Sequence, residues 1–243
     1  MIGLGAGVVP RRFQARGIAT DVVDIDPDVV RMARAHFALD PALPVFVADA
    51  RQFLARSGQR YDYVVLDVFT GDTTPGHLLS LEAMQLIRAR MTARGVLAVN
   101  LVGDIGPRGR MTASVVKTLR AVFERVEVRP TFVPEEDGPI GNLVLIALDR
   151  SDVPTNVDVP DALAVHPLAA RGVRHALTHR VEPASTAGAV VLTDDFNPID
   201  LEDLAVKERV RRQILESTDW RLLLSARHTA PVWATVHNTK GRG

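Results

Sequence analysis

The chain opens with "MIGLGAGVVP" (residues 1–10), in which Gly3, Gly5 and Gly7 alternate with other residues. A glycine turn of this kind normally closes a buried strand and precedes a helix whose N-terminus faces a nucleotide ligand. Almost no strand precedes this one, and each missing apolar side chain would cost about 1.5–3 kcal/mol of burial. We expect the natural start to lie upstream of Met1 or the gene copy to be truncated. A partner chain that covers the gap, or a degenerate domain, is the alternative.

Downstream of the turn, apolar runs of strand length alternate with runs of helical period. The strand-like runs are residues 18–26, 44–50, 61–69, 96–102, 125–133 and 142–149, and the helical runs are 27–37, 51–58, 78–91 and 111–123. This alternation predicts a parallel sheet with helices on both faces. The last two strands are joined by "PEEDGPIG" (residues 134–141), which is too short for a crossover helix. We therefore expect an α/β fold with a doubly wound, mostly parallel sheet that ends in an antiparallel hairpin.

Composition excludes several classes of protein and of site. The 243 residues contain 29 Lys plus Arg and 29 Asp plus Glu, a balance that gives no general reason to expect nucleic acid or a membrane as partner. Because the chain has no cysteine, disulfides, thiolate zinc sites and a cysteine nucleophile are excluded. No apolar run approaches the roughly 18 residues of a membrane span and no signal peptide is evident, so a cytoplasmic protein is expected.

The pattern predicts three parts of the chain. Residues 1–150 carry the alternation and form a Rossmann-like cofactor-binding and catalytic domain. Residues 151–225 form a helical and loop-rich extension that packs on the same domain. Residues 226–243 show no periodicity and are expected to form a flexible tail.

Two acidic residues at strand ends extend the site begun by the glycine turn. Asp24 follows the glycines by about 20 residues, the spacing at which a carboxylate accepts both ribose hydroxyls of a nucleotide. A solvated strand-end acid is the alternative for Asp24. Asp49 ends the next strand, where it would accept the amino group of adenine, cap the following helix, or do both. We assign the cofactor site to Gly3, Gly5, Gly7, Asp24, Asp49 and Ala50.

The stretch "VVLDVFTGDTTPGHL" (residues 64–78) carries the predicted reaction site. An apolar strand ends in Asp67, and the loop after it contains Asp72 and His77. A second acidic pair, Asp194 and Asp195, follows an apolar run in "VLTDDFNPID" (residues 191–200). Carboxylates that converge on one binding site attract a cation, so we expect the substrate to be a small amine rather than an acid or a phosphate. We assign catalysis to Asp67 and Asp72, and substrate binding to His77, Asp194 and Asp195. A hydrogen bond to the backbone is the alternative role for His77.

These motifs resemble the spermidine synthase family, the polyamine aminopropyltransferases, in its divergent bacterial spermidine synthase-like branch. The order of elements resembles the class I S-adenosylmethionine-dependent transferases. The matching stretches are "IGLGAG", "VVDIDPDVV", "VADAR", "YDYVVLDVFTGDTTPGHLLSLEAM", "GVLAVNLVG" and "VLTDDFNPID". The resemblance implies that Asp24 binds ribose, Asp49 binds adenine and Asp67 acts on the acceptor amine. It further implies decarboxylated S-adenosylmethionine as donor, no metal, and a homodimer as one state of assembly.

The chain departs from the family pattern at the N-terminus and in two loops. The family's N-terminal β-rich segment is absent from the sequence. Ala6 stands where the strict enzymes have an acid that binds the donor's amino group, and the second acid of the loop after Asp67 is displaced to Asp72. A methyltransferase that uses intact S-adenosylmethionine is therefore one alternative function. A non-catalytic member that acts as a binding module is the other.

Overall fold

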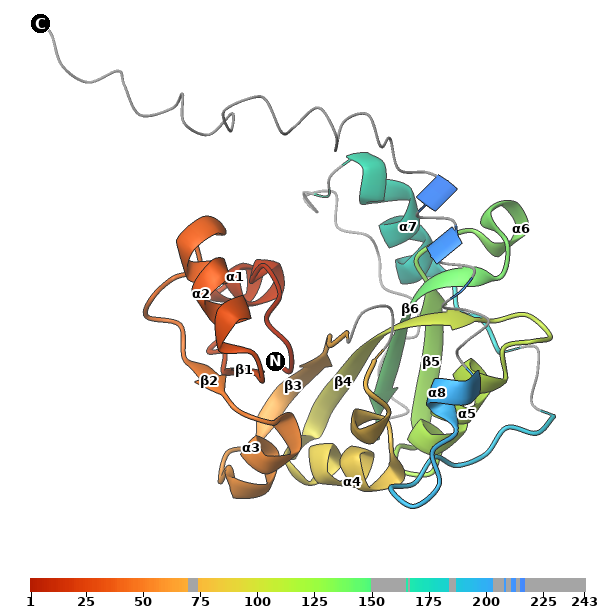
Figure 1. Cartoon of the computed structure of the whole chain (residues 1–243), viewed down its shortest axis with the longest axis horizontal. Helices are drawn as coiled ribbons and strands as arrows, with labels where there is room; N and C mark the ends of the chain where they lie inside the picture. Colours follow the sequence, from red (N-terminus) through yellow and green to blue (C-terminus); the bar gives the residue numbers. More distant parts are fainter. Residues whose placement is uncertain are drawn as a thin grey trace, which may run out of the picture. The chain divides into compact units, whose positions relative to one another are not determined.

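The structure is a computed structural model that describes residues 1–69, 74–149, 165, 167–183, 187–202, 208, 211–212 and 215–216. The chain divides into two units, Met1–Lys207 and Glu208–Gly243. Every element described below belongs to the first unit (Figure 1). None of the helices within the described residues combines the length and apolarity needed to cross a bilayer.

The elements alternate along the chain as the sequence predicts. The strands are β1 (Val22–Asp24), β2 (Val45–Val47), β3 (Tyr61–Leu66), β4 (Met91–Asp104), β5 (Arg125–Pro130) and β6 (Ile140–Leu148). The helices are α1 (Val8–Gln14), α2 (Pro27–His36), α3 (Ala50–Arg56), the 3-10 helix η1 (Gly76–Leu78), α4 (Leu81–Ala89), α5 (Arg110–Arg120), α6 (Pro134–Asp137), α7 (Pro167–Thr178) and α8 (Ile199–Glu202).

The first strand after the glycine turn is shorter than the predicted run of residues 18–26. The segment before Val22 folds back on the end of α1 instead of pairing. There the amide of Ile18 donates to the carbonyl of Phe13 (3.0 Å), and the hydroxyl of Thr20 donates to the carbonyl of Ile18 (2.9 Å). These local hydrogen bonds keep the backbone of Ile18 out of the sheet, and the strand begins at Val22, whose amide donates to the carbonyl of Pro44 (3.0 Å).

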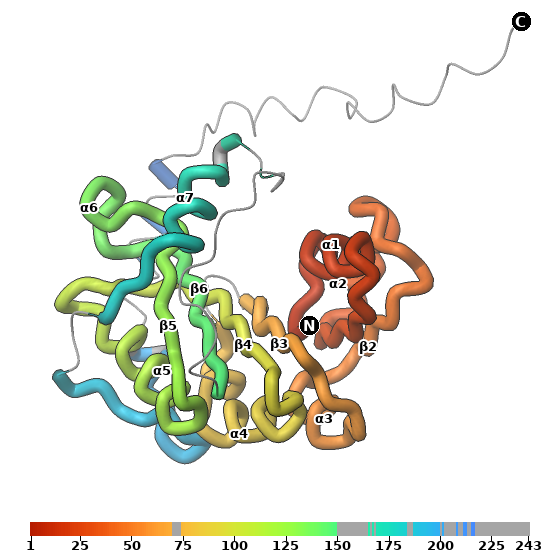
Figure 2. Tube along the Cα trace, turned by 180° about the vertical axis from the view of Figure 1, so that it is seen from behind, coloured from red at the N-terminus to blue at the C-terminus, as the bar shows by residue number. Residues whose placement is uncertain are grey.

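The strands form a mixed sheet of the predicted class. β1 pairs with β2 and β3 pairs with β4, both in parallel. β6 lies between β4 and β5 and is antiparallel to both. Ile2 forms parallel bridges with Val23 on β1 and Leu66 on β3, which gives the order β2, β1, Ile2, β3, β4, β6, β5. Figures 1 and 2 show β3, β4, β6 and β5 side by side. The doubly wound sheet with a terminal antiparallel hairpin is therefore confirmed.

The segment around Ile2 occupies the centre of this sheet. Its amide donates to the carbonyl of Val65 (2.8 Å), and its carbonyl accepts the amide of Asp67 (2.9 Å). On the other side, the amide of Gly3 donates to the carbonyl of Val23 (2.8 Å). The Ile2 side chain is 3% exposed and belongs to the main hydrophobic cluster. Ile2 and Gly3 thus occupy the position of a central strand, and the chain continues from them directly into the glycine turn.

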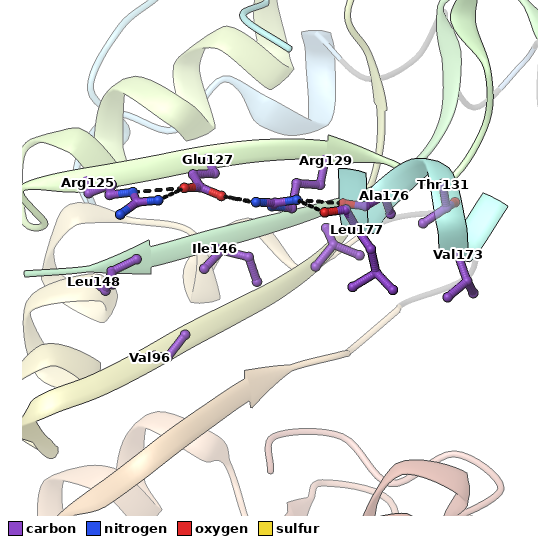
Figure 3. Close-up of a pocket in the computed structure, with 11 residues that line it drawn as sticks. Val96, Arg125, Glu127, Arg129, Thr131, Ile146, Leu148, Val173, Ala176 and Leu177 are labelled. Atoms are coloured by element: carbon purple, nitrogen blue, oxygen red, sulfur yellow. Dashed lines mark hydrogen bonds and ion pairs between the residues drawn. The ribbon is translucent and has the colours of Figure 1, made fainter. Parts of the chain in front are cut away.

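Alternate residues of β5 face opposite sides of the sheet, as strand geometry requires. Val126 and Val128 join the core beneath α5, whereas Arg125, Glu127 and Arg129 lie in a row toward α7 (Figure 3). Glu127 accepts hydrogen bonds from Nε of Arg125 (2.8 Å) and Nε of Arg129 (2.8 Å). Burial alone would raise the pKa of Glu127, but the two guanidinium groups outweigh it and the pKa is lowered. The carboxylate of Glu127 is therefore held ionised between two positive charges.

Helix α7 is anchored to the sheet through its C-terminal end. Nη1 of Arg129 donates to the carbonyls of Ala176 (2.8 Å) and Leu177 (2.9 Å), which the helix itself leaves without partners. A cavity of about 400 Å³ lies between α7 and the sheet, lined by apolar side chains that include Val96 and Ile146 (Figure 3). None of the predicted site residues lines this cavity.

The close approach of Gly3 to Asp67 gives a test of the fold. Gly3 has φ of 90°, and a Cβ there would lie 2.1 Å from the carbonyl oxygen of Asp67. Gly3→Ala should lower the free energy of unfolding by about 4 kcal/mol or more, because backbone must move. Gly5→Ala is the matched control, because its φ is 52° with nothing within 4 Å of the added Cβ. Gly5→Ala should lower the free energy of unfolding by only about 1–2 kcal/mol, the cost of a left-handed backbone for a residue with a Cβ. Equal losses in urea unfolding of the two variants would contradict the packing described.

Candidate active site

The glycine turn has the backbone conformation that glycine alone adopts readily. Gly3, Gly5 and Gly7 have φ of 90°, 52° and 70°. Gly7 is the N-cap of α1, and Gly3 is pressed against the backbone of Asp67. Gly5 is different, because open space surrounds the position of an added Cβ. The turn is therefore fixed at both ends and offers its middle to a ligand.

Asp24 lies against this turn, as the spacing predicts. Its Oδ2 accepts the amide of Leu4 (2.8 Å), and its Oδ1 accepts the amide of Asp26 (3.0 Å). Each carboxylate oxygen has a further lone pair, so the residue can hold the turn and still accept hydroxyl groups. Ile25 follows with 68% of its surface exposed, and sequence reasoning missed it. An apolar side chain left exposed at a strand end would offer a face to a purine ring. The ribose role of Asp24 stays a prediction.

Asp49 lies at the end of the neighbouring strand and has the capping role that the sequence allows. Its Oδ1 accepts the amide of Gln52 (2.9 Å) as the N-cap of α3, and Ala50 begins the helix in a buried position. Its Oδ2 lies 3.7 Å from Nε2 of His77. The ring of His77 thus lies beside the predicted adenine acid. The adenine role itself stays a prediction.

Asp67 follows β3 directly and is oriented by a residue that sequence reasoning missed. Nδ2 of Asn100, on the adjacent strand β4, donates to Oδ1 of Asp67 (2.9 Å). The hydroxyl of Thr74 in turn lies 3.4 Å from the carbonyl oxygen of Asn100. Asn100 is the only polar side chain in the run "VLAVNLV", and a polar group in a buried strand needs a partner, which could have revealed it. Asp72, the second predicted catalytic acid, lies outside the described residues.

Asp194 is held by side chains from two distant helices. Its carboxylate accepts a bidentate pair of hydrogen bonds from Arg51 on α3 (2.8 and 2.6 Å) and a third from the hydroxyl of Ser80 (2.6 Å). The hydrogen bonds from Arg51, and then that from Ser80, lower its pKa from 3.8 to about 2. Asp195 is exposed and makes no hydrogen bond or ion pair with any other described residue. The two neighbouring acids therefore have different surroundings.

The structure thus brings three of the predicted acids to one edge of the sheet. Asp24, Asp49 and Asp67 lie at or just beyond the carboxyl ends of β1, β2 and β3, where ligands of open α/β sheets bind. Asp194 is linked to this edge through Arg51. Within the described ranges, no group of three or more His, Asp or Glu side chains is arranged to hold a metal ion.

No protein family model matches the chain. Among curated proteins, it is 29% identical over 213 residues to a polyamine aminopropyltransferase of Vibrio vulnificus, with 83% of this chain and 68% of the relative covered. It is 33% identical over 160 residues to an N-terminal histidine N-methyltransferase of Emericella nidulans, with 63% of this chain but 28% of the relative covered. The chain thus spans less than a third of the fungal protein and about two thirds of the bacterial one.

Solved structures show the same fold. A probable spermidine synthase from Corynebacterium glutamicum superposes with a TM-score of 0.61 at 21% identity, covering 79% of this chain and 70% of that one. Human methyltransferase-like protein 13, in complex with SAH, superposes with a TM-score of 0.50 at 23% identity, and the match covers 62% of this chain and 71% of that one. The protein therefore has the fold shared by S-adenosylmethionine-dependent methyltransferases and spermidine synthases.

The place of Asp24 beside the turn yields a binding test. Asp24→Asn should weaken the binding of 5′-methylthioadenosine by about tenfold to a hundredfold, because it removes charge-assisted hydrogen bonds to ribose. Asp26→Asn is the control, since Asp26 only caps α2 and Asn caps equally well. If calorimetry gave the two variants affinities for 5′-methylthioadenosine within about twofold of each other, Asp24 would not belong to the site.

The surroundings of Asp194 predict how it titrates. A pKa lowered from 3.8 to about 2 means that the pair with Arg51 stabilises the folded state above pH 4. That contribution is lost as the pH falls toward 2, and it is reduced by solvent because the side chain is 39% exposed. Carboxyl-carbon NMR should show Asp194 titrating near 2, and Arg51→Met should move the pKa toward 3.8. An Asp194 that titrates near 3.8 in the unaltered protein would show that the ion pair does not form.

Proposed function

We propose that the protein transfers an aminopropyl group from decarboxylated S-adenosylmethionine to a small di- or polyamine. The observation that carries this proposal is the position of Asp67. It follows β3 in contact with the backbone of the glycine turn, and Asn100 holds one of its oxygens. The names of the Vibrio and Corynebacterium relatives agree with this chemistry.

The residues present fit an adenosyl donor. The backbone at Gly5 is open to a ligand, Asp24 keeps acceptor capacity beside it, and Ile25 exposes an apolar surface at the same strand end. Asp49 lies one strand further out, since the amide of Ala48 pairs with the carbonyl of Asp24 (3.0 Å). Ribose and adenine would then extend from the turn across the ends of β1 and β2, with the reacting group toward Asp67.

Asp67 would position the acceptor amine for attack. The sulfonium of the donor supplies the leaving group. Asn100 fixes Oδ1 of Asp67, and Oδ2 would accept a hydrogen bond from the neutral amine. A carboxylate is a weak base toward an ammonium of pKa about 10. Its main contribution is therefore orientation of the amine and stabilisation of the positive charge that develops on nitrogen, with the proton passing on to solvent.

A methyltransferase is the second candidate, and Ala6 favours it. An acid at this turn position would repel the carboxylate of intact S-adenosylmethionine, and alanine does not. The similarity to the fungal N-methyltransferase agrees with this alternative. Both candidates use the same turn and the same strand ends, so they differ in donor and not in the placement of Asp67.

Asp67→Asn tests the proposed role directly. The change keeps the shape and the bond to Asn100 but removes the charge that holds the amine. Turnover should fall by about 10²- to 10⁴-fold, the usual effect of a positioned acid–base group, measured as release of methylthioadenosine. The affinity for 5′-methylthioadenosine should change little, because Asp24 and Asp49 carry that binding.

Asp62→Asn is the matched control on the same strand, because Asp62 is exposed and only accepts a hydrogen bond from Thr92 (2.9 Å). It should leave turnover unchanged. Activity of Asp67→Asn within a few-fold of the unaltered protein would exclude Asp67 from the chemistry. If the unaltered protein released neither methylthioadenosine nor S-adenosylhomocysteine with any amine, both transferase candidates would fail and a binding module would be favoured.

A further inference from the structure

A segment that follows α7 in sequence is fixed against the central helices. We call residues 187–199 the strap. The amide of Leu192 donates to the hydroxyl of Thr118 on α5 (2.9 Å), and its carbonyl accepts the amide of Leu81 at the start of α4 (2.7 Å). Leu192 is 0% exposed and Ile199 is 4% exposed. The strap is therefore part of the core at both of these positions.

Between them, the strap faces the turn of residues 75–77 across a cavity of about 350 Å³. The lining residues are Pro75, Gly76, His77, Thr193, Asp194 and Asn197. Nδ2 of Asn197 donates to the carbonyl of Gly76 (2.8 Å), which joins the two walls at one end. The volume lies at the small end of the range for ligand pockets, about 300–1,000 Å³.

The cavity adjoins the predicted reaction site. Thr74, whose hydroxyl contacts the carbonyl of Asn100, immediately precedes the cavity wall, and Asn100 holds Asp67. On the other side, the ring of His77 lies near Asp49. The cavity wall is therefore linked to Asp67 through Thr74 and Asn100, and to Asp49 through His77.

A single guanidinium contacts both walls of this cavity. Arg51 binds Asp194 of the strap through two hydrogen bonds, and its Nη1 lies 3.3 Å from the carbonyl oxygen of His77 in the turn. Arg51 is also two residues beyond Asp49, in the first turn of α3. Movement of this helix start would therefore be transmitted directly to the strap.

We infer that Arg51 and Asp194 are positioning residues. They set the distance between the strap and the turn of residues 75–77, and therefore how well the acceptor fits between them. This inference rests on the proposed transferase function. Arg51 and Ser80 already donate three hydrogen bonds to the Asp194 carboxylate, and the guanidinium offsets its negative charge, so Asp194 attracts an acceptor ammonium only weakly. Asp194 therefore acts through the strap and does not contact the acceptor.

A double-mutant cycle separates positioning from direct contact. Arg51→Met and Asp194→Asn should each raise KM for 1,4-diaminobutane by about fivefold, and the double variant should be no worse than either. kcat and the affinity for 5′-methylthioadenosine should stay within about twofold. Arg51→Lys, which keeps the charge but not the planar fork, should recover part of the loss. Arg120→Met is the control, because Nη2 of Arg120 donates to both carboxylate oxygens of Glu182 (2.9 and 2.7 Å) and neither residue lines the cavity.

Direct contact predicts a different pattern. If Asp194 bound the amine, Asp194→Asn would raise KM while Arg51→Met, which frees the carboxylate, would leave it unchanged or lower it. That result would overturn the inference. Hydrogen exchange gives a readout that does not depend on turnover. Amides of the strap should lose protection in Arg51→Met and Asp194→Asn but not in Arg120→Met, and equal protection in all three would also overturn it. A protein without transferase activity but with this exchange pattern would contradict the proposed function alone.

Discussion

The structure depends on the backbone pairing of Ile2 with β1 on one side and β3 on the other. Within the described residues, this is where the ladder of β1 and β2 joins the ladder of β3, β4, β6 and β5. The same pairing places Gly3 against Asp67 and directs the glycine turn toward Asp24. A parallel sheet places its strand ends at one edge, so one central residue brings together acids that are 43 positions apart in sequence, from Asp24 to Asp67.

Patterns of local origin could be predicted from the sequence, and pairings between distant residues could not. Apolar periodicity located the strands and helices, and the short "PEEDGPIG" connection correctly predicted the antiparallel hairpin. The N-caps at Asp26 and Asp49 follow from the residue type and its position. The partner of Asp194 is Arg51, 143 residues away, and no spacing rule connects them. Asn100 was missed because only the register of β3 and β4 places it beside Asp67.

Several residues of the proposed site also stabilise the local structure. Asp24 holds the glycine turn, Asp49 caps α3, and Asp67 continues the backbone pairing of β3 with Ile2. Folding of the sheet therefore pre-organises the carboxylates, which lowers the entropic cost of orienting a ligand. Asp194 shows the opposite case, because its charge is neutralised by Arg51. In the proposed reaction, the strand-end acids would then attract the cationic acceptor.

The central claim is that this arrangement serves aminopropyl transfer, and the choice of donor tests it most directly. Calorimetric titration of the purified protein with decarboxylated and with intact S-adenosylmethionine compares the two donors on the same turn, where residue 6 is an alanine. The account predicts that the decarboxylated form binds at least about tenfold more tightly than the intact form, because Asp67, toward which the reacting group points in the proposed complex, repels a donor that carries its own carboxylate. Tighter binding of intact S-adenosylmethionine, or binding of neither, would contradict it.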